Sequence, residues 1–166
     1  MTHLEYMQGE AAKNMAFHME DMEKLQAATD TTLNFLYVFI SAVFSASVRM
    51  YLEDGYAAIK ISLPVLCIYL TALAIYLVLS CGLARSVEAP ANEPKKLKIP
   101  DGYTSEQIQN FELDNLQVRI EKNRDRNART ANNLNFVRVM LCFSPIIFLL
   151  AILAVWFFRG LCSAGA

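Results

Sequence analysis

The chain has 166 residues, of which 15 are Lys or Arg and 16 are Asp or Glu, so its formal net charge is −1. Hydrophobic residues make up 55% of it, and its mean hydropathy of +0.29 is high for a soluble domain. The apolar residues are also gathered into long uncharged blocks. These features exclude an ordinary water-soluble protein and predict an all-α membrane protein with three transmembrane helices.

Residues 1–30 are predicted to form an N-terminal amphipathic helix. Its weakly apolar face recurs every three or four residues, which is the spacing of one helix face. We interpret this face as a packing surface, although methionine also suits a groove that adapts to changing partners. Asp30, Thr31 and Thr32 can cap a helix, so we expect a new helix to begin there. The face consists of Met7, Ala11, Met15, His18, Met22 and Leu25.

Residues 31–84 are predicted to form a transmembrane hairpin that turns at Gly55. Its second half, residues 61–84, has 24 residues without a charge, which is enough to cross a hydrocarbon core of about 30 Å. Its first half is uncharged over residues 33–48, near the minimum length for a span. We expect both halves to cross the membrane.

Polar residues in these two spans share helix faces. Asn34, Ser41 and Ser45 lie on one face of the first span, where they either mediate helix packing or line a water-filled pore. We take these three as the pore-lining candidates. No charged residue lies deep in a span, which argues against a proton-coupled transporter. Three spans are too few to enclose an aqueous pore, so a channel requires an oligomer. The second span has a similar face, made of Ser62, Tyr69, Tyr76 and Ser80.

Residues 85–104 read as a linker, because its prolines and glycine prevent a long helix. Thr104 and Gln107 form a capping box for the next helix, predicted over residues 105–138. No proline or glycine occurs from there to Ser144. We therefore expect one helix to continue into the third span, with Pro145 as its only kink.

Residues 139–166 are predicted to hold the third transmembrane helix and a short outer tail, because no charge occurs between Val139 and Phe158. Residues 85–133 contain nine Lys and Arg, whereas the short loop between the first two spans has two at its edges. The positive-inside rule then places the N-terminus and residues 85–138 in the cytoplasm and the C-terminus outside.

Four cations recur along one face of the third predicted helix, at spacings of three and four residues: Arg119, Lys122, Arg126 and Arg129. Arg129 precedes the third span by ten residues, or roughly 15 Å of helix, and Arg119 by twenty. Attraction to lipid headgroups fades within about 8 Å at physiological salt. Most of this face is therefore too distant to serve the bilayer.

Two uses of the basic face stay open. Residues 1–30 have six acidic and two basic residues, net −4, and residues 118–138 have six cations and two acids, net +4, so the helices can dock. Alternatively, the face binds an anionic nucleotide or short single-stranded nucleic acid, because arginine, which outnumbers lysine five to one here, suits phosphate oxygens. The ligand-binding candidates are Arg119, Lys122, Arg124, Arg126 and Arg129, with Lys95, Lys96 and Lys98 in the linker.

Asn123 and Asn127 continue the heptad spacing of Leu113, Leu116 and Ile120, at positions where leucine is the usual core residue. Polar residues at such positions lower stability and fix register, or mark a helix that shifts. A hydrated stalk next to the membrane is the alternative interpretation.

Enzyme motifs are absent. His3 and His18 are the only histidines, and the chain has no zinc-protease motif, nucleophile elbow or phosphate-binding loop. We expect no catalytic residues, no metal site and no cofactor.

The arrangement of spans, with the segments "VRIEKNRDRNAR" and "KKLK", resembles small bacterial membrane effectors of anti-phage defence. It is most similar to the channel effector of Hailong systems. That resemblance implies a tetrameric channel in a bacterial inner membrane. The channel would be held shut by short DNA oligomers, which a neighbouring nucleotidyltransferase makes. The alternative is a membrane anchor or assembly protein whose acidic and basic helices dock without a ligand. A holin-like lesion former is a third possibility.

Overall fold

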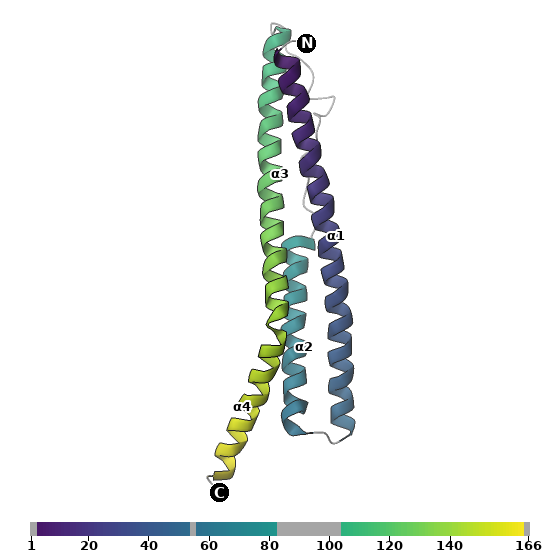
Figure 1. Cartoon of the computed structure of the whole chain (residues 1–166), viewed down its shortest axis with the longest axis vertical. Helices are drawn as coiled ribbons and strands as arrows, with labels where there is room; N and C mark the ends of the chain where they lie inside the picture. The colour runs from purple at the N-terminus through teal and green to yellow at the C-terminus, as the bar shows by residue number, and fades with distance from the viewer. Residues whose placement is uncertain (1–2, 54–55, 83–103, 165–166) are drawn as a thin grey trace. The chain divides into compact units, whose positions relative to one another are not determined.

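The computed structural model describes residues 3–53, 56–82 and 104–164 (Figure 1). These residues are almost wholly helical and contain no strand, in agreement with the all-α prediction. The elements are α1 (His3–Leu52), α2 (Ala57–Leu77), the short π-helix η1 (Val78–Gly82), α3 (Ser105–Cys142) and α4 (Ser144–Ala164).

Two of these helices, α1 and α2 with its continuation into η1, are long and apolar enough to cross a membrane. A third candidate arises when α3 and α4, which are bent by 44° at their junction, are taken as one broken span. The break falls at Phe143, two residues before the proline at which the sequence predicts a kink.

The expected N-cap at Asp30, Thr31 and Thr32 is wrong, because α1 passes through these residues without interruption. Thr32 donates its hydroxyl to the carbonyl oxygen of Ala28 at 2.8 Å, the bond of a threonine inside a helix. No proline or glycine lies between Gly9 and Gly55, so nothing ends the preceding helix. Residues that favour caps act as caps only where a helix has reason to stop.

The capping box of α3 is confirmed. The amide of Gln107 donates to the hydroxyl of Thr104 at 3.3 Å, and the amide of Thr104 donates to the Gln107 side chain at 3.0 Å. Both bonds satisfy amides that have no partner within the helix.

Removing this cap gives a local, measurable effect. Thr104→Ala should destabilise the first turn of α3 by about 1 kcal/mol, because one capping acceptor is lost. Amide exchange at residues 105–108 should then be about five times faster. Ser105→Ala removes the neighbouring hydroxyl and should leave exchange unchanged; equal effects of the two substitutions would contradict the capping role.

The chain divides into two compact units. Unit 1 contains residues 1–27 and 84–131, and its described part is the first half of α1 and most of α3. Within it the two helices run parallel, because Met15 contacts Asn123 and, further along both helices, His18 contacts Asn127.

Unit 2 contains residues 28–83 and 132–166, and it holds the apolar core. Leu36, Leu70, Leu77 and Val137 are fully buried there. α2 contacts α4, and the core combines side chains from α1, α2 and the end of α3. The core consists of Leu33, Leu36, Val43, Leu66, Leu70, Leu73, Ala74, Leu77, Leu134 and Val137.

Candidate functional site

Five candidate ligand-binding residues lie on α3 in unit 1. Lys122, Arg124 and Arg129 are exposed, whereas Arg119 and Arg126 are half-buried. Arg124 lies 3.7 Å from the carboxylate of Asp125, and both side chains are largely exposed. Such an exposed pair contributes little stability and leaves the guanidinium able to bind another anion. We call these five residues the α3 cations; the linker candidates Lys95, Lys96 and Lys98 lie outside the described residues.

The buried contact between the two helices of unit 1, which we call the seam, is partly polar. Asn123 is 5% exposed and donates its amide to the sulfur of Met15 at 3.4 Å. Asn127 is 8% exposed and donates to the carbonyl oxygen of His18 at 2.7 Å. Met15 and Ile120 are the most buried apolar residues of the seam. The prediction that both asparagines occupy core positions is confirmed.

The pairing of the N-terminal helix with α3 agrees with the docking alternative, but the two contacts that define it join uncharged groups. Two of its acidic residues pair along α1 itself, Glu10 with Lys13 at 2.7 Å and Glu20 with Lys24 at 2.8 Å. The hydrogen bond to Lys24 lowers the pKa of Glu20 and raises that of Lys24. The charges of Glu10 and Glu20 are thus partly neutralised by lysines of their own helix.

Sequence reasoning identified Asn123 and Asn127 but did not identify their partners. Met15 and His18 belong to the methionine-rich face of the N-terminal helix, whose spacing matches that of the α3 core positions. The available signal was two faces of equal spacing on segments of opposite net charge. Spacing alone cannot say which face packs on which, or in what direction.

The pore-lining candidates Asn34, Ser41 and Ser45 are all exposed on α1 in unit 2. Ser41 donates to the carbonyl oxygen of Tyr37, and Ser45 donates to that of Ser41, each at 2.8 Å. Because both serine hydroxyls donate to carbonyl oxygens of their own helix, this face can be in contact with lipid, with a second helix or with water.

The second polar face serves packing. Tyr69 donates its hydroxyl to the carbonyl oxygen of Met140 at 2.8 Å, and Tyr76 donates to the side chain of Asn133 at 3.3 Å. Ser62 is fully buried and donates to Ala58. The two tyrosine bonds hold α2 against α3 in unit 2, as expected for the packing interpretation, whereas the Ser62 bond lies within α2.

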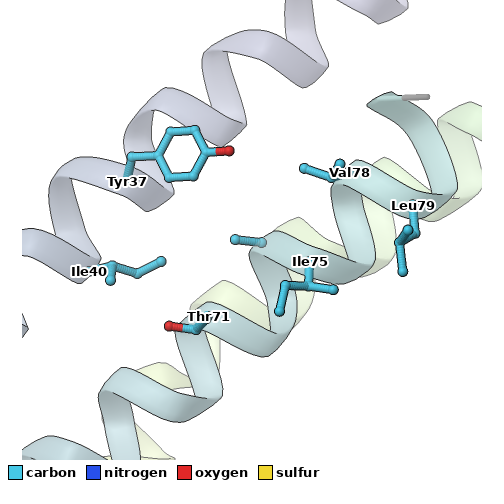
Figure 2. Close-up of a pocket in the computed structure, with 7 residues that line it drawn as sticks. Tyr37, Ile40, Thr71, Ile75, Val78 and Leu79 are labelled. Atoms are coloured by element: carbon cyan, nitrogen blue, oxygen red, sulfur yellow. The ribbon is translucent and has the colours of Figure 1, made fainter. Parts of the chain in front are cut away.

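Unit 2 also has an apolar groove of about 330 Å³ beside η1 (Figure 2). Tyr37 and Ile40 of α1 face Thr71 and Ile75 of α2 across it, and Val78 and Leu79 of η1 complete one end. None of the lining residues is charged, so this groove does not suit a phosphate.

Among residues 3–53, 56–82 and 104–164, no group of histidine, cysteine, aspartate and glutamate side chains is arranged to hold a metal ion. Comparison with known proteins found no family model, no curated protein and no solved structure that matches this chain.

Proposed function

We propose that this chain is a homo-oligomeric, three-span membrane effector that conducts ions under the control of an anionic nucleotide or short single-stranded nucleic acid bound by the α3 cations. The observation that carries the proposal is the accessibility of Lys122, Arg124 and Arg129 on one helix. Lys122 and Arg129 are seven residues apart and so share one face of the helix. Exposed cations of this kind bind a phosphate backbone without reading its sequence. The resemblance to anti-phage effectors supports a location in a bacterial inner membrane and a ligand made by a neighbouring nucleotidyltransferase.

The exposed face of α1 supports the conducting role. Asn34, Ser41 and Ser45 lie in the uncharged stretch of α1, residues 33–48, and their side-chain oxygens would gain from contact with water. One copy has too few spans to surround a pore, so copies must meet around an axis. Around such an axis the α3 cations of several copies would combine their fields and attract a polyanion more strongly than one copy does.

A flux assay tests this function. Purified protein in liposomes should pass K⁺ at a rate that changes when oligo(dA) or ATP is added. Lys122→Gln with Arg129→Gln should abolish most of that response, because two phosphate-binding cations are lost. Arg49→Gln is the matched control, since Arg49 is exposed but pairs with Glu53 at the end of α1.

Each outcome of the flux assay has a definite meaning. Flux that ignores both probes would remove the nucleotide ligand and leave a simple lesion former. Absence of flux under all conditions would remove the channel.

The second candidate is a non-conducting membrane anchor, and the packing of Met15 and His18 against α3 favours it. Charge reversal distinguishes it from the first. Lys122→Glu with Arg126→Glu, and Glu20→Lys with Glu23→Lys, should each weaken the assembly if opposite charges hold the helices together. Recovery in the combined variant would support docking as the role of the basic face.

A further inference from the structure

At the junction of α3 and α4, one backbone hydrogen bond of the helix is missing, and a side-chain hydrogen bond takes its place. Pro145 has no amide proton, so the carbonyl oxygen of Leu141 loses its ordinary helical donor. The hydroxyl of Ser144 donates to that oxygen instead. The helix resumes directly afterwards, where the amide of Ile147 donates to Phe143 at 3.0 Å.

The carbonyl oxygen of Met140 at this junction has two donors from different helices. The amide of Phe143 donates to it at 3.0 Å, in the tighter turn of three residues. The hydroxyl of Tyr69 on α2 donates to it at 2.8 Å, from 71 residues away in the sequence. The Phe143 amide belongs to the same turn and does not depend on α2, so the Tyr69 hydroxyl is the second donor, and it is the one that joins α2 to the bend.

Space for movement lies next to this junction. A groove of about 310 Å³ borders it, lined by Leu141, Ser144 and Pro145 on one side and by Phe35 and Phe39 of α1 on the other. Of the residues that line this groove, only Ser144 and Leu66 of α2 are buried, so a change of angle on this side would disturb fewer close contacts than one within the core.

From these observations we propose that the Phe143 junction is a hinge whose bent state is held by the Tyr69–Met140 hydrogen bond. α4 then has two positions, bent by 44° as observed and more nearly straight. Tyr69 acts as the positioning residue that favours the first. This inference depends on neither the proposed ligand nor conductance, so its failure would leave the proposed function untouched.

Electron–electron distance measurements in lipid nanodiscs test the hinge. Spin labels at Ile61 of α2 and Leu153 of α4, both exposed, report the position of α4 after the four native cysteines are replaced by alanine. Straightening would move Leu153 by up to about 10 Å, given nine residues of helix beyond Ser144 at about 1.5 Å each. In the unsubstituted protein, where Pro145 and the Tyr69 bond both favour the bent state, the distance of the bent state should dominate.

Pro145→Ala restores the amide and should add a second, straight population. Tyr69→Phe in the Pro145→Ala background should then lower the ratio of bent to straight roughly three- to tenfold, the effect of one such hydrogen bond. Tyr37→Phe in the same background is the matched control, because it removes an exposed hydroxyl elsewhere in unit 2.

Three results would overturn the hinge. One is a single unchanged distance in Pro145→Ala, because the angle would then be set by packing. Another is a wholly straight Pro145→Ala, because Tyr69 would then hold nothing. The last is an equal ratio with and without the Tyr69 hydroxyl. Pro145→Ala retains Tyr69, so it decides the first two even if the Tyr69 variant does not assemble.

Discussion

Met15→Ala should lower the free energy of local unfolding of unit 1 by about 2–5 kcal/mol, the usual cost of truncating a buried methionine. Met15 is only 1% exposed and is the most deeply buried apolar side chain of the seam. The substitution leaves a cavity and also removes the sulfur that accepts from Asn123. Hydrogen exchange of the full chain in detergent, followed at residues 112–127, measures the change.

Two further variants separate the effect of the cavity from the effect of the lost sulfur acceptor. Met15→Leu nearly preserves the side-chain volume, so the change in packing should lower the stability of unit 1 by less than about 1.5 kcal/mol. Any further loss in this variant would come from the missing sulfur acceptor of Asn123. Met15→Leu combined with Asn123→Leu makes this part of the seam apolar and should recover or exceed the original stability. Met7→Ala is the control, since Met7 is 40% exposed, and should change stability by less than about 0.5 kcal/mol. Equal losses at Met7 and Met15 would show that the seam is not the core of unit 1.

Oligo(dA) binding should weaken steeply as salt rises. If the four cations on one helix face each neutralise a phosphate, the slope of log affinity against log salt is about −2.8, from about −0.7 per contact on single strands. Raising salt from about 50 to 200 mM would then lower affinity about 50-fold. Titrations at several salt concentrations measure this slope, and several copies acting together would make it steeper.

Removing two of these cations tests which residues produce the salt dependence of binding. Lys122→Gln with Arg129→Gln should reduce the magnitude of the slope by about 1.4 and weaken binding to every oligomer sequence alike. Arg49→Gln should leave the slope unchanged. Binding that ignores salt, or that falls equally in the Arg49 control, would exclude a phosphate-binding role for the α3 cations.

Local patterns in the sequence predicted those parts of the fold that short-range chemistry decides. The Thr104–Gln107 cap depends on residues three apart, and the core positions of Asn123 and Asn127 depend on helix periodicity. The false boundary near residue 30 shows the opposite case. Cap-forming side chains were present, but a helix ends only where a breaking residue or a lost contact stops it, and α1 has no breaking residue there.

The candidate site was predictable only in part. Spacing placed the α3 cations on one helix, yet only the structure distinguishes exposed Lys122 and Arg129 from half-buried Arg126. The hydrogen bond of Tyr69 to Met140 was beyond prediction, because it joins residues that no short-range pattern connects. The kink at Pro145 was predictable from a missing amide, whereas the group that holds it was not.

The contact of Met15 with Asn123 spans 108 positions of the chain, which has a consequence for biosynthesis. A ribosome adds about 5–20 residues each second, so the partner of Met15 is made roughly 5–20 s later. During that interval the N-terminal methionine face has no α3 from its own chain. Nascent copies made side by side on one messenger RNA could then exchange these segments, and intertwined assemblies would be formed at the moment of translation rather than afterwards.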